Sequence, residues 1–213
     1  MSATSLNPNS TTSSSKLNSL DILSPVEYTS PISEGGAMFP EALEYSNNTA
    51  DIYVAGGKPR KKKLVEAAAR WMLGYTLGTR LANNVSLRID LVNDLKNTNV
   101  YGSVLWADSN NRPREFDMDL CNHINDRTLF RVLAHEIVHI RQYATGDLKD
   151  LATHADYCKW KNKLVQSEGR GRGSYFDLPW EKEARRDQEI IFNEWRRAHN
   201  YHFKQKGGDI YGD

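Results

Sequence analysis

Residues 129–140 read LFRVLAHEIVHI, an apolar run that contains the pattern H-E-x-x-H between His135 and His139. Residues four apart lie on the same face of an α-helix, so a helix places these two imidazoles one above the other. Two imidazoles in this arrangement can bind one Zn²⁺ from the same side. Glu136 then lies beside the metal, where it can take a proton from water. The stretch predicts a helix that carries a zinc site and a general base.

The apolar neighbours of the motif weigh against a surface pattern that arises by chance. Leu129, Val132, Leu133 and Ile140 make the helix largely apolar, which predicts that it is buried. Buried histidine and glutamate side chains need polar partners. A metal ion supplies them in one interpretation, and hydrogen bonds within a metal-free core supply them in the other.

The whole chain sets broader limits. Its 213 residues suffice for one domain with a tail, and its net charge of +1 gives no overall attraction to nucleic acid or membrane. Cys121 and Cys158 form no C-x-x-C pair, which fits a reducing compartment. The chain has no apolar run of about 18 residues and no apolar secretory signal, so we expect a cytoplasmic protein that does not enter a membrane.

Composition divides the chain into three parts. Residues 1–55 are rich in Ser, Thr and Asn and contain scattered Pro and Gly, which predicts a flexible arm that binds a partner protein. Residues 56–200 carry the periodic apolar patterns of a folded domain. Residues 201–213 form a C-terminal tail.

The expected fold class is α+β. We expect a small antiparallel sheet, of three strands or slightly more, packed on an N-terminal helix and on the H-E-x-x-H helix, with further helices following. The turn-rich residues 108–113 predict a hairpin between the second and third strands. In chain order, the expected elements are a helix at 62–81, strands near 87–91, 100–106 and 114–120, the motif helix ending at Gly146, a connecting helix at 147–167 and a last helix at 177–197.

A zinc hydrolase site usually has three protein ligands and one open position. His135 and His139 supply two ligands, and the third must come from downstream. Three side chains are candidates: Glu181 and Glu183 on the last expected helix, and His154 between the two helices.

Two segments together carry a family resemblance. HEIVHIRQ at residues 135–142, followed by LPWEKEA at residues 178–184, resembles the gluzincin group of metallopeptidases, especially small metallopeptidase-like proteins encoded by bacteriophages. The resemblance covers roughly residues 85–195. It implies a zincin-like fold, Zn²⁺ as cofactor, and hydrolysis of peptide bonds in a protein or peptide substrate with Glu136 as general base.

The resemblance also implies how the third ligand is supplied. Compact zincins have an E-x-x-A pattern that matches Glu181 with Ala184. Other gluzincins pair the ligand glutamate with an aspartate four residues later, which matches Glu183 with Asp187. The first match favours Glu181 and leaves Glu183 and His154 as alternatives.

A second, weaker resemblance concerns His154. SprT-like proteases, which cut proteins cross-linked to DNA, follow H-E-x-x-H with a third histidine in an H-G-x-x-aromatic segment. Residues 154–159 are similar but lack the glycine, and their aromatic residue is shifted by one position. In that interpretation a basic run contacts phosphates. In the other, the run is the solvated start of a helix. The basic residues are Lys58, Arg60, Lys61, Lys62 and Lys63.

Further roles follow from position and resemblance. Tyr143, Tyr175 and Arg141 are candidates for stabilising an oxyanion. An extended substrate is expected along the sheet edge, placed near residues 114–119. The arm would bind a viral or host protein, in the host cytoplasm or in a virion. A catalytically silent zincin-fold protein, with a structural or interaction role, is the alternative to an enzyme.

Overall fold

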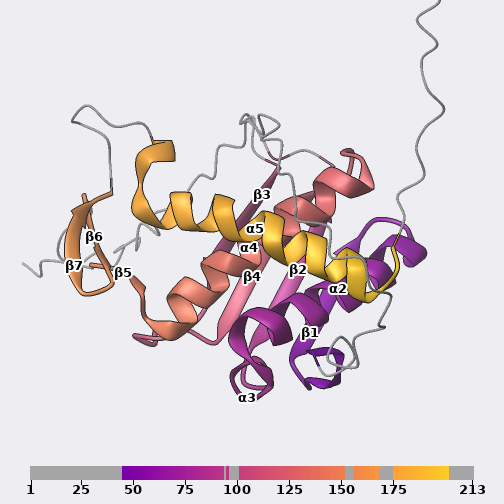
Figure 1. Ribbon diagram of the computed structural model, residues 1–213, viewed down its shortest axis with the longest axis horizontal. Helices are drawn as coiled ribbons and strands as arrows, with labels where there is room; N and C mark the ends of the chain where they lie inside the picture. Colours follow the sequence, from indigo (N-terminus) through magenta and orange to yellow (C-terminus); the bar gives the residue numbers. More distant parts are fainter. Residues whose placement is uncertain (1–44, 94, 96–100, 152–155, 168–174, 202–213) are drawn as a thin grey trace, which may run out of the picture.

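The computed structural model describes residues 45–93, 95, 101–151, 156–167 and 175–201, and it is an α+β structure (Figure 1). One mixed sheet and one small antiparallel sheet accompany the helices. The elements are η1 Tyr45–Asn47, β1 Asp51–Gly56, α2 Pro59–Leu77, α3 Thr79–Ala82, β2 Ser86–Val92, β3 Gly102–Trp106, β4 Glu115–Cys121, α4 Asp126–Thr145, β5 Leu148–Asp150, β6 Tyr157–Trp160, β7 Lys163–Gln166, η2 Tyr175–Asp177 and α5 Pro179–Ala198.

The main sheet has the strand order β1-β2-β4-β3. β1, β2 and β4 run parallel, and the crossover that parallel neighbours require is made by α2 between β1 and β2. β3 pairs antiparallel with β4, which confirms the predicted hairpin. Alternate residues of β2 and β4 are buried, so one face of the sheet is turned to the core.

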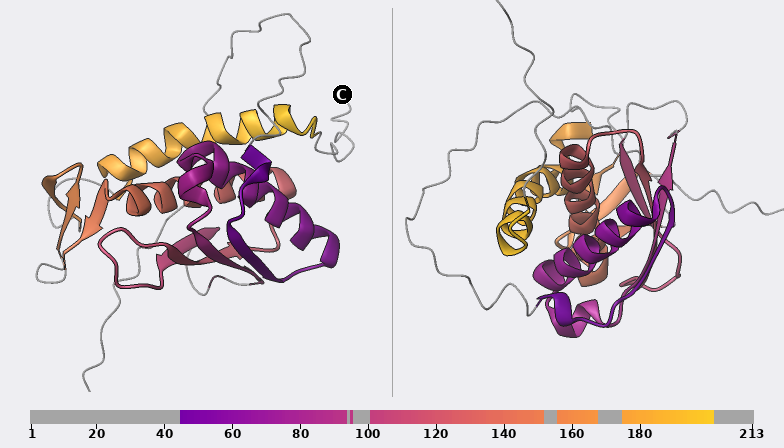
Figure 2. Two further views of the ribbon diagram at one scale, coloured as in Figure 1. Left: turned by 90° about the horizontal axis from the view of Figure 1, so that it is seen from below. Right: turned by 90° about the vertical axis from the view of Figure 1, so that its right-hand side faces the viewer.

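Helices cover that face in two layers. Figure 2 shows α2 and α4 against the sheet and α5 on the far side of α4. α4 is therefore enclosed by the sheet on one side and by α5 on the other. This is why its apolar residues are not confined to one stripe. The ring of Phe130 on α4 packs on Trp195 of α5, with 4.6 Å between ring centroids.

The ends of α4 follow from local sequence. Asn125 caps the first turn, where its side-chain oxygen accepts a hydrogen bond from the backbone N–H of Thr128 at 2.9 Å. Gly146 ends the helix in the left-handed conformation with φ 80°, as predicted. The helix that carries the H-E-x-x-H motif is therefore capped at both ends.

Three expectations about the sheet edges and strands were wrong. β1 lies within the part of the chain that we assigned to the flexible arm, so the folded domain begins before residue 55. Residues 114–120 are not an edge, because β4 lies between β2 and β3. β3 is the edge strand on that side, and the sheet is mixed rather than antiparallel. Residues 1–44 and 202–213 lie outside the described residues.

The expected connecting helix at 147–167 is instead the antiparallel sheet β5-β6-β7. Lys161 and Asn162 both have positive φ, 46° and 67°, which is the backbone of a two-residue hairpin turn. Cys158 and Trp160 alternate toward the core with exposed Lys159 between them. The spacing of the apolar residues in this segment is compatible with a helix and with strands. The tight turn at Lys161 and Asn162 favours strands.

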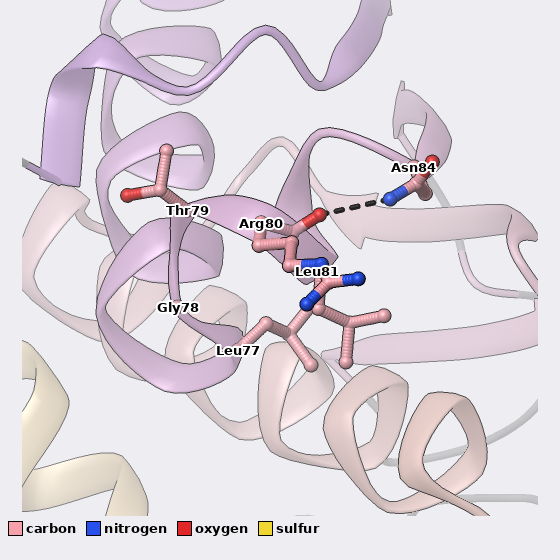
Figure 3. A pocket seen from close by; sticks show the side chains of 6 residues that line it. All are labelled: Leu77, Gly78, Thr79, Arg80, Leu81 and Asn84. Carbon is pink, nitrogen blue, oxygen red and sulfur yellow. Dashed lines mark hydrogen bonds between the residues drawn. The ribbon is translucent and has the colours of Figure 1, made fainter.

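A hollow of about 430 Å³ lies at the corner where α2 meets α3 (Figure 3). Asn84 closes one side of it, where its amide donates to the carbonyl of Arg80 at 2.8 Å. The hollow is lined by Leu77, Gly78, Thr79, Arg80, Leu81 and Asn84.

No helix within the described residues has the length and apolar character of a membrane span.

Candidate metal centre

α4 presents both histidines of the H-E-x-x-H motif on one face, as predicted. The ring centroids of His135 and His139 are 4.8 Å apart, and the side chains are buried, with residue exposures of 1% and 6%. Glu136, between them in sequence, is 0% exposed. Three polar side chains in the interior need partners of matching chemistry.

α5 brings Glu181 to the two histidines. The distance from Glu181 Oε1 to His139 Nε2 is 3.3 Å, and that from Oε2 to His135 Nε2 is 3.5 Å. Glu181 is 1% exposed. Among the described residues, these three form the one group of His, Cys, Asp or Glu side chains close enough to hold a metal ion together.

The tautomer of His139 follows from its neighbour Gln142. The amide nitrogen of Gln142 donates to the carbonyl oxygen of Trp180 and to Glu183, both at 3.0 Å. Those oxygens only accept, so the amide oxygen must face His139, whose Nδ1 lies 2.8 Å away. Nδ1 of His139 therefore carries the proton, and Nε2 presents a lone pair.

His135 has the same arrangement with a residue from α5. Its Nδ1 lies 2.9 Å from the amide oxygen of Gln188, whose amide nitrogen donates to Glu189 at 3.3 Å. The Nε2 atom of His135 thus also presents a lone pair. The two Nε2 atoms are 3.1 Å apart.

Four hydrogen-bond acceptors therefore converge: two imidazole nitrogens and the two oxygens of Glu181. Acceptors this close repel one another unless a cation lies among them. Ligands about 2.0–2.2 Å from a tetrahedral Zn²⁺ are roughly 3.3–3.6 Å apart, close to the spacing here. The donor set and its geometry fit a zinc ion, and a single carboxylate with two neutral imidazoles is a ligand set that zinc prefers.

The protonation states agree with a cation site. Burial lowers the pKa of His139, since it disfavours the charged ring. For Glu181, burial raises the pKa, but the two histidines and a hydrogen bond from Tyr175 outweigh it and lower the pKa to about 2. Glu181 is therefore a carboxylate at neutral pH.

Glu136 lies against the start of the edge strand. A Cβ added to Gly102, the first residue of β3, would be 3.0 Å from Glu136 Oε1 and 2.4 Å from Cγ1 of Val132. Only glycine allows β3 to approach α4 this closely. The close approach brings the edge of the sheet next to the predicted base.

The structure separates the three candidates for oxyanion stabilisation. The hydroxyl of Tyr175 donates to Glu181 Oε1 at 2.6 Å, and burial raises the pKa of that hydroxyl. Tyr143 is buried on the helix stripe of Glu136, packs on Trp106, and its hydroxyl has no hydrogen-bond partner among the described residues. Arg141 instead pairs with Glu183 and Asp187. Neither belongs to the metal group, which consists of His135, His139 and Glu181.

The two alternative ligands have different outcomes. Glu183 is not directed at the histidines, because its carboxylate pairs with Arg141 at 2.9 Å and with Lys161 at 2.8 Å. His154 lies outside the described residues. Sequence reasoning missed Gln142 and Gln188 as partners of the histidines. Gln142 could have been found, since it lies three residues after His139 on the same helix.

The basic run opens α2. Pro59 occupies the first turn of that helix, and the ammonium group of Lys61 donates to the backbone carbonyl of Asn122 at 2.8 Å. The other basic residues of the run also lie at the start of α2, as expected if the run is the solvated start of a helix. A contact of this run with nucleic acid stays a prediction.

Comparison of the chain with protein-family models, with curated proteins and with solved structures found no match.

Proposed function

We propose that the chain is a zinc-dependent metallopeptidase with a zincin-like fold. The observation that carries the proposal is the convergence of His135, His139 and Glu181, buried and with their acceptor atoms turned to one point. Glu136, the proposed general base, directly follows His135 on α4. Two histidines, a carboxylate and an adjacent glutamate are a set that can support zinc-assisted hydrolysis.

The chemistry divides between the metal and the chain. When bound, zinc would act as a Lewis acid that makes water more acidic and polarises a carbonyl group. The carboxylate of Glu136 takes a proton from the attacking water, which adds to the peptide carbonyl carbon. Glu136 then gives that proton to the leaving nitrogen as the C–N bond breaks, so peptide and water become a carboxylic acid and an amine.

Other residues support a peptide as the substrate. β3 is an edge strand, so its outer backbone groups can pair with an extended chain, which gives affinity without reading side chains. The hydroxyl of Tyr175 is a donor at the group of His135, His139 and Glu181 and is the proposed stabiliser of the oxyanion.

Two further functions compete with this proposal. A catalytically silent zincin-fold protein needs no base beside its metal ligands, so the presence of Glu136 directly after His135 favours the enzyme. A SprT-like protease would use a third histidine ligand. The position of Glu181 beside both histidines instead favours a glutamate ligand.

Substitution of Glu136 by glutamine tests the proposal. E136Q keeps the shape of the side chain but cannot accept the proton, so hydrolysis should fall at least about 100-fold while one zinc per chain is retained. Zinc is measured by elemental analysis. Cleavage is measured by mass spectrometry on casein and on a mixed peptide library.

The matched control is E66Q, which removes a half-exposed carboxylate on α2 and should change neither quantity. Cleavage by E136Q at the rate of the unaltered protein would show that Glu136 is not the base. A zinc-loaded protein that cleaves nothing would favour the silent alternative.

A further inference from the structure

Two chains of hydrogen bonds lead away from the metal group, one from each histidine. The His139 relay runs from His139 through Gln142 to Glu183 and Arg141. Nδ1 of His139 is 2.8 Å from the Gln142 oxygen, and the Gln142 nitrogen donates to Glu183 Oε2 at 3.0 Å. Arg141 donates to the same carboxylate oxygen at 2.9 Å.

The His135 relay has the same order of groups: His135, Gln188, Glu189 and Arg131. Nδ1 of His135 is 2.9 Å from the Gln188 oxygen, and the Gln188 nitrogen donates to Glu189 Oε1 at 3.3 Å. Arg131 donates to that same oxygen from Nε at 2.7 Å. Each relay links α4 to α5, so the contact between the two helices also sets the orientation of both rings.

A neutral amide side chain can occupy the middle of such a relay because it both accepts and donates. Its oxygen accepts from the imidazole, and its nitrogen donates to the carboxylate. A carboxylate at position 142 could accept from His139, but it would then face the carboxylate of Glu183. Gln142 is 0% exposed and Gln188 is 4% exposed, so water does not compete for either amide.

We propose that Gln142 and Gln188 are positioning residues, which hold His139 and His135 in the Nδ1–H tautomer before a metal ion arrives. Glu183 and Glu189, each fixed by an arginine, determine which end of each amide faces its histidine. Both Nε2 lone pairs are thereby turned to Glu181, and the cation meets a formed site. The inference rests on the metal site of the proposed function, but it does not depend on peptide hydrolysis.

The first test reads the tautomers directly. Long-range ¹H–¹⁵N correlation spectra of the full-length, metal-free protein should show His135 and His139 with a proton on Nδ1. Gln142→Met removes both the acceptor and the donors at nearly constant volume, and His139 should lose that preference. Gln142→Glu restores an acceptor, so it should recover the Nδ1–H tautomer.

The second test measures metal affinity with Co²⁺ alone, through its visible absorption spectrum in competition with a chelator. Loss of a partner of a ligand histidine typically weakens metal binding about 10–100-fold, and this loss is expected for Gln142→Met and for Gln188→Met. The matched control is Gln166→Met, which alters an exposed glutamine on β7 and should leave affinity and spectrum unchanged.

Several results would overturn the proposal. They are an Nε2–H tautomer in the unaltered metal-free protein, unaltered cobalt affinity in both methionine variants, or a Gln142→Glu variant that loses the tautomer as Gln142→Met does. If one variant does not fold, the other relay gives the same comparison through Gln188→Met and Gln188→Glu. Retained relays in a protein that binds metal but cleaves no peptide would refute the proposed function and leave this inference standing.

Discussion

Tyr175 donates a short hydrogen bond to a residue of the metal group, 2.6 Å from its hydroxyl to Glu181 Oε1. Tyr175→Phe removes one donor from a buried carboxylate. A hydrogen bond to a charged group contributes about 1.5–3 kcal/mol, so the metal-free protein should lose stability of that order. Urea unfolding in the presence of a chelator measures the loss.

Tyr53→Phe is the control for that experiment, because Tyr53 is 62% exposed on β1. It removes the same hydroxyl from a solvated position and should change stability by less than about 0.5 kcal/mol. Equal stabilities of the two variants would contradict the role given to the Tyr175 hydroxyl.

The two cysteines differ in their surroundings, and this difference predicts their reactivity. Burial, followed by the charge of Asp150, raises the pKa of the Cys158 thiol to about 12. The thiolate is the reactive form, so Cys158 should resist iodoacetamide at pH 7.5, and its rate should rise about tenfold per pH unit up to its pKa. Mass spectrometry of the Cys121→Ser variant isolates this site. Rapid alkylation of the folded variant at pH 7.5 would show that Cys158 is not shielded.

Among the elements, the contact between β3 and α4 depends on one glycine. Gly102→Ala places a methyl group 2.4 Å from Cγ1 of Val132 and 3.0 Å from Glu136 Oε1, so the strand must move away from the helix. Overpacking of this kind costs about 1–3 kcal/mol. It should also lower hydrolysis, because it displaces the edge strand from Glu136. Thermal unfolding and the peptide assay measure the two effects.

Ser103→Ala is the control, since it removes a hydroxyl from the neighbouring half-buried position of β3 without adding atoms. A Gly102→Ala variant as stable and as active as Ser103→Ala would mean that the strand tolerates the methyl group. The close approach would then have no role in placing Glu136.

For the molecule as a whole, the metal group joins the middle of α4 to the start of α5. Zinc at 100 times its dissociation constant should add about 2.7 kcal/mol to the stability of the folded state. For a domain of this size that corresponds to a rise in Tm of roughly 5–10 °C. Differential scanning calorimetry of chelator-treated protein, with and without zinc, measures the shift.

Two comparisons make the calorimetry specific. Glu181→Ala should lose the zinc-dependent rise in Tm, because it removes the one ligand supplied by α5. Magnesium in place of zinc should give no rise, since two nitrogen ligands do not suit it. An unchanged Tm with zinc would contradict a shared metal site between the two helices.

The sequence alone determined the features that depend on near neighbours in the chain. The apolar run around His135 and His139 determined that α4 is a buried helix with two histidines on one face, since helical periodicity is local. The stop at Gly146 followed from the backbone preference of glycine. The hairpin of β3 and β4 followed from a turn-rich link.

Only the tertiary structure decided between Glu181 and Glu183. Residues two positions apart on a helix point about 200° apart, so Glu181 and Glu183 cannot both reach the two histidines, and the rotation of α5 on α4 determines which one does. We expected the sheet edge near residues 114–119, whereas the structure has β3 at the edge, because strand order depends on pairing between distant segments. The partner of His135 was hidden for the same reason, since Gln188 reaches it only where the two helices cross.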